Sequence, residues 1–378
     1  MTTTLRVIVD QMAGRVPGGI GRYTEELTRQ LIATAPRDCD VEGIVSAVSP
    51  SVVDDLTRRL PGLAGLSRSR LPRRELAAAW RLGLPAAAGG MIHAPSLLAP
   101  LYGHDPVNDA TQVVVTIHDV VPWTHPETLS SHGARWHRAM ARRARRHADA
   151  VVVPTHAVAE QLAEYLDFGD RVRVIGGAVG STIVLPPDPD ARAADLDLPA
   201  DFLLSVGTLE PRKGIAPLIR ALARPETRDL PLLVVGPQGW GDLDLAQVAD
   251  DAGIAPGRVR SLGFLSDTDL ALVLQRATVF VYPSLAEGFG LPIIEAFSAG
   301  TPVVHSDAPA LVEVGASAGV VVERHDAEGY PERLADAIGR LLDDRDLRER
   351  YITAGSDRVR AFSWRDSAER VWQLHADL

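Results

Sequence analysis

The fold of this chain is decided by one stretch, Val279-Phe-Val-Tyr-Pro-Ser284-Leu-Ala-Glu287-Gly-Phe-Gly290-Leu-Pro-Ile-Ile-Glu295-Ala-Phe-Ser-Ala-Gly300-Thr-Pro-Val-Val-His305. Its first residues are apolar, β-branched or aromatic, which predicts a buried strand. A short helix is predicted from Leu291 to Ala299, because proline is tolerated in the first helical turn and Gly300 suits the position just after a helix. The stretch therefore predicts a strand, a glycine-containing loop, a helix and a second strand.

The loop before this helix has the chemistry of a ligand site. Its backbone N–H groups would point outward at a helix N-terminus, which favours an anion or sugar hydroxyls; they belong to Gly288, Phe289, Gly290 and Leu291. Glu287 and Glu295 bracket the loop, and a carboxylate can accept hydrogen bonds from two neighbouring hydroxyls. The alternative is an ordinary turn with two surface glutamates. The combination of two glycines, Pro292 and Gly300 favours the ligand site.

The run from Glu287 to Glu295 resembles the E-x7-E signature of the retaining glycosyltransferases of family four, and 299–304 is similar to the next strand of that family. The resemblance implies an α/β fold of the GT-B type, with two Rossmann-like domains facing a central cleft. It also implies a nucleotide-sugar donor, with Glu287 on the donor sugar and Glu295 on the ribose.

Composition limits the other possibilities. A length of 378 residues suggests two domains, and a net charge of -10 disfavours generic nucleic-acid binding. The lone cysteine, Cys39, rules out an internal disulfide, and no signal-peptide layout precedes the first apolar run. We therefore expect a cytoplasmic protein. Of the 39 lysine and arginine residues, only Lys213 is a lysine.

The N-terminal half opens like a Rossmann-like domain. A strand over 5–9 is followed by a glycine-rich loop over 10–21 and an amphipathic helix. The G-x-G-x-x-G dinucleotide fingerprint is absent, so a tight turn is an equally good interpretation of the loop. The family resemblance implies that Gly19 approaches the donor pyrophosphate.

His118 follows a second buried strand in this half, predicted over 112–117. The carboxyl ends of strands are where open α/β sheets bind ligands. From the residues alone, a capping or core histidine is the better interpretation. The resemblance implies instead that His118 faces the transferred sugar, while Asp119 would orient it or cap the next segment.

A second α/β domain begins with a strand over 202–206. Arg212 and Lys213 follow in a loop before a helix, where two cations suit a pyrophosphate, although a solvent-exposed turn is the alternative. Arg212, Lys213 and Gly214 match the phosphate loop of the family. The resemblance also implies that the backbone of Gly263, Phe264 and Leu265 contacts the nucleotide base.

These elements predict an acceptor-binding domain over 1–185, a linker over 186–200 and a nucleotide-sugar-binding domain over 201–362. The last helix, within 363–378, should cross back onto the first domain. An arginine-rich helical segment, interrupted by prolines, is predicted over 52–88. Another basic helix carries Arg135 to Arg146; it could lie on anionic lipid, but a solvated face is the favoured interpretation.

The predicted function is retaining transfer of a hexose, with mannose favoured, to a hydroxyl of a glycan, a glycolipid or a small molecule. GDP-mannose is the leading donor, and UDP-sugars stay open. Arg212, Lys213 and the loop amides would stabilise the departing diphosphate. No Asp-x-Asp pair ends a strand beside the phosphate loop, so we predict no metal and no other cofactor. The alternatives are an epimerase or phosphorylase on this fold, and a non-catalytic nucleotide-sugar-binding protein.

Overall fold

The computed structural model describes residues 3–14, 18–84, 89–105, 108, 110–239 and 243–378. The chain divides into two compact units. Unit 1 comprises Met1–Thr124, Ser131–Gly177 and Ser363–Leu378, and unit 2 comprises His125–Ser130 and Ala178–Phe362. Among the described residues, no helix combines the length and apolar character needed to span a bilayer.

Unit 1 contains a parallel sheet in the order β3-β2-β1-β4-β5-β6-β7. Its strands are β1 (Thr3–Ile8), β2 (Cys39–Val45), β3 (Gly65–Arg68), β4 (Met91–Ala94), β5 (Gln112–Thr116), β6 (Ala150–Val153) and β7 (Val172–Val174). Val113, Val114 and Val115 are all fully buried, as expected for a central strand covered on both faces.

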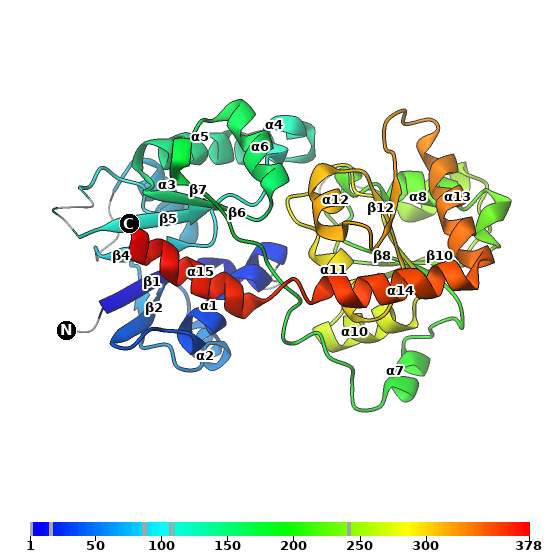
Figure 1. The fold of residues 1–378 in the computed structure, drawn as a ribbon, viewed down its shortest axis with the longest axis horizontal. Coiled ribbons are helices and arrows are strands. Elements are labelled where there is room, and N and C mark those ends of the chain that lie inside the picture. The colour runs from blue at the N-terminus through cyan, green and yellow to red at the C-terminus, as the bar shows by residue number, and fades with distance from the viewer. Residues whose placement is uncertain (1–2, 15–17, 85–88, 106–107, 109, 240–242) are drawn as a thin grey trace. The chain divides into compact units, whose positions relative to one another are not determined.

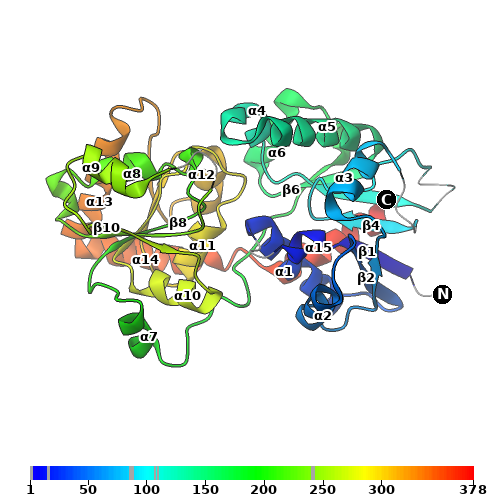
Figure 2. The same cartoon turned by 180° about the vertical axis from the view of Figure 1, so that it is seen from behind.

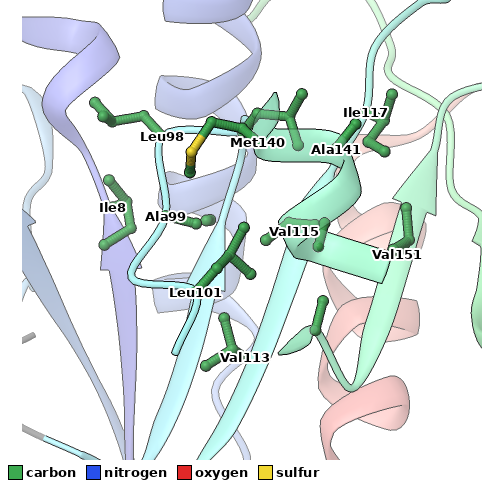
Figure 3. Packing of buried hydrophobic residues seen from close by; sticks show 14 of the residues in the cluster. Ile8, Leu98, Ala99, Leu101, Val113, Val115, Ile117, Met140, Ala141 and Val151 are labelled. Atoms are coloured by element: carbon green, nitrogen blue, oxygen red, sulfur yellow. The ribbon is translucent and has the colours of Figure 1, made fainter. Parts of the chain in front are cut away.

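Helices cover both faces of this sheet (Figures 1 and 2). They are α1 (Gly19–Ala33), α2 (Pro50–Arg59), α3 (Arg73–Arg81), α4 (Val121–Thr124), α5 (Ser131–His147), α6 (His156–Tyr165) and α15 (Trp364–Asp377), with 3-10 turns η1 (Asp10–Ala13) and η3 (Gly169–Arg171). On one face, Met140 and Ala141 of α5 pack against Val113, Val115 and Val151 (Figure 3).

The final helix, α15, belongs to unit 1 although unit 2 precedes it in the chain. The Trp372 indole N–H donates to the carbonyl of Leu31 on α1 at 3.1 Å. The Ser367 hydroxyl donates to the carbonyl of Gly176 at 2.8 Å. These contacts fix the end of the chain on the first domain.

Unit 2 contains a second parallel sheet, in the order β10-β9-β8-β11-β12-β13. Its strands are β8 (Leu203–Val206), β9 (Leu232–Val235), β10 (Val259–Gly263), β11 (Val279–Tyr282), β12 (Val303–Ser306) and β13 (Val320–Val322). Leu203, Leu204 and Ser205 of β8 and all four residues of β11 are buried, as expected for strands covered on both faces.

The helices of unit 2 are α7 (Pro189–Asp195), α8 (Ile215–Ala221), α9 (Leu245–Asp251), α10 (Asp267–Arg276), α11 (Leu291–Ser298), α12 (Pro309–Gly315), α13 (Tyr330–Asp343) and α14 (Arg345–Val359), with 3-10 turns η2 (Pro126–Thr128), η4 (Pro211–Lys213) and η5 (Pro225–Thr227). Alternate strand residues point to opposite faces. Leu203 therefore packs with α8 and α13, whereas Leu204 packs with α10 and α11. The prediction of two parallel α/β units is confirmed.

Two parts of the sequence prediction differ from the structure. The helix predicted over 52–88 is interrupted by β3, whose pairing with β2 adds an edge strand; 85–88 lie outside the described residues. The predicted linker contains α7, where Asp188 accepts a hydrogen bond from the amide of Ala191 at 3.1 Å. Arg192 of α7 bonds Asp269 at 2.7 Å, so this segment belongs to unit 2 and the division falls after Gly177.

Candidate active site

The loop between β11 and α11 has the conformation that its sequence predicts. Gly290 lies in the left-handed region, with φ of 97°, directly before the first residue of α11, and Pro292 occupies the first turn. After the helix, Gly300 has φ of 75°, and the amide of Thr301 bonds the carbonyl of Ala296 at 3.0 Å. These are the glycine-terminated helix end and the proline start that were predicted.

A second loop, between β8 and α8, packs directly against it. Gly214 has φ of 68°, and a Cβ there would lie 2.1 Å from the carbonyl oxygen of Pro283. The amide of Leu285 donates to the carbonyl of Arg212 at 2.8 Å. Only glycine permits this approach, because any side chain would meet the neighbouring backbone. The glycine therefore places Arg212 and Lys213 beside the loop of Glu287.

Glu287 is the centre of a buried polar cluster. Its Oε1 accepts hydrogen bonds from Lys213 Nζ at 2.6 Å, from the Ser284 hydroxyl at 2.6 Å and from the Tyr282 hydroxyl at 2.9 Å. Lys213 also donates to the Tyr282 hydroxyl at 3.1 Å. Arg212 Nη1 lies 3.5 Å from Oε2, the other oxygen. Oε1 is thus saturated, whereas Oε2 keeps capacity to accept hydrogen bonds.

The charges of this cluster set the protonation of Glu287. Burial alone raises the pKa of its carboxyl, but the charges of Lys213 and Arg212 outweigh burial and lower the pKa to about 2. Burial and the neighbouring carboxylate raise the pKa of the Tyr282 phenol well above its ordinary value. At neutral pH Glu287 is therefore an anion that accepts hydrogen bonds, and Tyr282 is a neutral donor.

Arg212 is bound on several sides. Its Nη1 donates to the carbonyl of Ala286 at 2.8 Å, and its Nη2 lies 3.2 Å from Oε2 of Glu210. The side chains of Arg212 and Lys213 are 14% and 12% exposed. Both cations therefore lie within the protein surface, next to the N-terminus of α11, rather than extending into solvent.

The remaining predicted residues of unit 2 lie at the same edge of the sheet or on α11. Glu295 is 3% exposed on α11, four residues after its start. Phe289 meets Phe362 edge to face, with ring centroids 5.6 Å apart. Gly263 ends β10 with φ of 64°, Phe264 is half-exposed and Leu265 is buried. Parallel strands place the residues after β8, β10 and β11 at one edge, where α/β sheets bind ligands.

In unit 1, His118 lies just beyond the end of β5. Its Nε2 is 2.7 Å from the carbonyl oxygen of Pro95, so Nε2 carries the proton and Nδ1 is the acceptor of the neutral ring. Tyr23 of α1 meets the imidazole edge to face at 4.8 Å. Burial lowers the pKa of His118 below 6.5, which keeps the ring neutral at physiological pH. Asp119 accepts from the amide of Val121 at 3.0 Å, so it caps α4.

Gly19, the other residue predicted in unit 1, is the first residue of α1. A Cβ at Gly19 would have no atom within 4 Å, so open space lies beside this helix end. Sequence reasoning missed Tyr282, Ser284 and Tyr23. A tyrosine at a strand end followed by Pro-Ser was the available signal for the first two; Tyr23 reads as an ordinary core residue of an amphipathic helix.

Two family models match this chain. The model described as Glycosyl transferases group 1 matches residues 190–358, and the model described as Glycosyltransferase Family 4 matches residues 17–180. O-antigen chain mannosyltransferase B of Escherichia coli is 28% identical over 377 residues, covering 92% of each chain. Phosphatidyl-myo-inositol mannosyltransferase of Mycolicibacterium smegmatis is 36% identical over 171 residues, covering 44% of this chain and 42% of that protein.

Solved structures are similar in fold across both units. HepE of Anabaena in complex with UDP and glucose has a TM-score of 0.74 and 18% identity, with 100% of both chains covered. Sucrose-phosphate synthase of Thermosynechococcus elongatus has a TM-score of 0.72 and 22% identity, with 99% of this chain and 98% of that chain covered.

Proposed function

This chain belongs to the glycosyltransferases of family four, with the GT-B fold, and from that premise we propose that it transfers a hexose from a nucleoside diphosphate sugar to a hydroxyl group with retention at the anomeric carbon. The observation that supports this most is the cluster of Glu287, Lys213 and Arg212 beside the N-terminus of α11. It joins two cations, one carboxylate and a helix N-terminus at one ligand-binding edge.

The diphosphate of the donor is proposed to bind Arg212, Lys213 and the start of α11. As the bond between the sugar and the phosphate breaks, negative charge grows on the phosphate oxygens. Two fixed cations and backbone N–H groups stabilise that charge more in the transition state than in the ground state. The structure records no hydrogen bond from the amides of Phe289, Gly290 or Leu291 within the described residues, in keeping with this role.

Glu287 is proposed to hold the donor sugar through Oε2. A carboxyl with a pKa of about 2 cannot serve as a general acid at neutral pH, so it acts as an acceptor for sugar hydroxyls. Its negative charge would also stabilise the positive charge that develops at the anomeric carbon. Glu295 would accept from the ribose, and the backbone of Gly263 to Leu265 would contact the base.

His118 is proposed to contact the same sugar, and Gly19 to approach the pyrophosphate. Because the His118 Nε2 proton is engaged by Pro95, Nδ1 is the atom that can accept a hydrogen bond from a sugar hydroxyl. No covalent nucleophile is assigned, and retention is carried over from the family. No metal takes part in this proposal.

GDP-mannose is the proposed donor, because O-antigen chain mannosyltransferase B and phosphatidyl-myo-inositol mannosyltransferase are named for mannose transfer. HepE was solved with UDP and glucose, so UDP-glucose is the competing donor to compare with GDP-mannose. A lipid-linked or polymeric glycan is the proposed acceptor, and peripheral membrane contact through α5 is part of this proposal. No observation favours an epimerase or phosphorylase.

The test is a transfer assay with radiolabelled GDP-mannose and UDP-glucose, each with mannoside, glucoside and lipid-linked acceptors. We expect labelled product only when donor and acceptor are both present, with GDP-mannose preferred. Turnover that needs no acceptor would favour the epimerase. Release of a sugar 1-phosphate from a glycan and inorganic phosphate, with no nucleotide sugar present, would favour the phosphorylase.

A further inference from the structure

The hydroxyl of Tyr282 forms a triangle with the charged atoms of Lys213 and Glu287. It lies 3.1 Å from Lys213 Nζ and 2.9 Å from Glu287 Oε1, and those two atoms are 2.6 Å apart. An ammonium group can only donate, and an ionised carboxylate can only accept. The single proton of the phenol must therefore point to Glu287, while the phenol oxygen accepts from Lys213.

Tyr282 is the donor that the fold holds in place. It ends β11, which has β8 and β12 on either side, and its side chain is buried, with 2% exposure. Its ring stacks on Phe280, with centroids 5.9 Å apart and an angle of 19° between the planes. Lys213, by contrast, carries its ammonium on a flexible four-carbon stem. A ligand can therefore draw the ammonium aside, whereas the phenol stays in position.

Binding of a diphosphate would give Lys213 a competing acceptor. Two of its three N–H groups are used by Glu287 Oε1 and the Tyr282 hydroxyl, which leaves one for a phosphate oxygen. The negative charge of the diphosphate attracts the ammonium away from Oε1. One of the hydrogen bonds that hold the Glu287 carboxylate is then weakened at the moment when Oε2 would meet the donor sugar.

The hydroxyl of Ser284 is less committed to this carboxylate. It reaches Glu287 Oε1 at 2.6 Å, but two carbonyl oxygens are also within its range, those of Arg212 at 3.2 Å and Ala286 at 3.4 Å. For the Tyr282 hydroxyl, Glu287 Oε1 is the one acceptor recorded among the described residues. Tyr282 is therefore the group best placed to keep Oε1 occupied.

We propose that Tyr282 is a positioning residue of the transfer reaction, whose hydroxyl holds Glu287 Oε1 while Lys213 turns towards the donor diphosphate. Oε2 then stays directed at the donor sugar. This role rests on the proposed function, in which Glu287 binds the sugar and Lys213 binds the diphosphate. Tyr282 acts through Glu287 and needs no contact with the donor.

The experiment compares Tyr282→Phe with the wild type in the transfer assay, with GDP-mannose and UDP-glucose as donors. Losing one hydrogen bond to a charged group should lower kcat by roughly 10- to 100-fold. The KM for the donor, and the affinity for GDP and UDP measured by calorimetry, should stay within about threefold of the wild type. The reason is that Lys213 and Arg212 keep their charges in this variant.

A double-mutant cycle shows whether the hydroxyl acts through the carboxylate. When Tyr282→Phe is added to Glu287→Ala, kcat/KM should fall by less than about twofold further, because the group that Tyr282 positions is already absent. If the two losses multiplied instead, Tyr282 would act independently of Glu287, and the proposal would be wrong.

The matched control is Tyr330→Phe. Tyr330 is 1% exposed, and its hydroxyl donates to the carbonyl of Pro283, the residue after Tyr282, at 3.0 Å. Within the described part of the chain, no hydrogen bond joins it to Glu287. The control therefore removes an equally buried phenol hydroxyl from the same loop, and its kcat should stay within about threefold of the wild type.

Circular dichroism melting fixes an assay temperature at which every variant is folded. An equal loss of kcat in Tyr282→Phe and Tyr330→Phe, or a loss of nucleotide affinity in place of kcat, would overturn the role of Tyr282 and leave the transfer reaction standing. A wild type that transfers from neither donor would refute the proposed function, and this role with it.

Discussion

Lys213 Nζ lies 2.6 Å from Oε1 of Glu287, although the two residues are 74 positions apart in the sequence. The contact joins the loop after β8 to the loop before α11. It links two elements that the sequence suggested separately, and the charge of Lys213 helps to lower the pKa of the Glu287 carboxyl. The pair should therefore matter both for stability and for the proposed transfer reaction, and the variants below separate the two effects.

Glu287→Gln should reduce both stability and activity. Without the carboxylate, the mostly buried Lys213 loses its charged partner, while Arg212 keeps Glu210; this should cost about 3 kcal/mol of unfolding free energy. We expect kcat/KM for transfer to fall by at least about 100-fold. Urea denaturation and the transfer assay measure the two effects.

The double variant Lys213→Met/Glu287→Leu is the control for that experiment. Replacing both charges by apolar groups should restore much of the lost stability, because no buried charge is left unpaired. Activity should stay at the level of the inactive variants. If the double variant regained transfer along with stability, the pair would be a purely structural feature.

The pH dependence of stability should report the lowered pKa of Glu287. A carboxyl with a folded pKa of about 2 and an ordinary value of 4.5 stabilises the protein fully above pH 4.5, and this contribution is lost as the pH falls towards 2. By pH 3 the wild type should lose about 2 kcal/mol more than Glu287→Gln, relative to pH 6. An equal loss of unfolding free energy in the two proteins between pH 6 and pH 3 would show that the pKa of Glu287 is not lowered in the folded protein.

Gly214→Ala should destabilise the site through the contact with Pro283. Residue 214 has φ of 68°, and the alanine Cβ would lie 2.1 Å from the carbonyl oxygen of Pro283, so the variant must force the two loops apart. We expect a loss of at least about 2 kcal/mol and reduced donor affinity. Gly253→Ala is the matched control, since Gly253 has φ of 69° with no atom within 4 Å and should cost only about 1 kcal/mol. Similar losses in both variants would contradict the close approach.

His118 should act as a neutral hydrogen-bonding group. Because burial lowers its pKa below 6.5, activity should be constant through neutral pH and decline only as the pH falls below that value. Protonation would also favour the unfolded state, in which the histidine takes up a proton more readily. His118→Gln, which keeps one donor and one acceptor, should retain more kcat/KM than His118→Phe. The measurement is the pH–rate profile of the wild type and the two variants. A wild-type rate that stays constant into the acid range would contradict the prediction.

Turnover should be insensitive to chelation. In the proposed site, Arg212, Lys213 and backbone amides supply the positive charge that faces the diphosphate. Excess EDTA should therefore leave the rate within about twofold of the untreated enzyme. Activity abolished by EDTA and restored by a divalent cation would refute this prediction.

Much of this architecture follows from local sequence. The helix from Leu291, its proline start and its glycine end follow from steric rules that act within a few residues. The strand β3 was missed because Gly65 to Arg68 has no apolar run; it forms by pairing with β2 at the sheet edge. Tertiary pairing of this kind overrides local propensity.

The candidate site, too, has a part that follows from local sequence and a part that depends on tertiary contacts. The residue types that suit a diphosphate and a sugar could be chosen from the loops that carry them. The hydrogen-bond network around Glu287 could not be predicted from the sequence. Tyr282 and Ser284 become part of it only because Lys213, 74 positions from Glu287, reaches the same carboxylate oxygen. The left-handed Gly214 enables that contact, and nothing in its local sequence says which backbone it approaches.

The central claim is that the diphosphate of the donor binds Lys213 and Arg212 beside the start of α11. A crystal structure with a slowly reacting donor, GDP-2-deoxy-2-fluoromannose, tests it most directly. We predict phosphate oxygens within hydrogen-bonding distance of Lys213 Nζ, Arg212 and the amides of Phe289 to Leu291, with the sugar against Glu287 Oε2. A diphosphate bound elsewhere, with Lys213 and Arg212 still engaged only by groups of the protein, would contradict the claim.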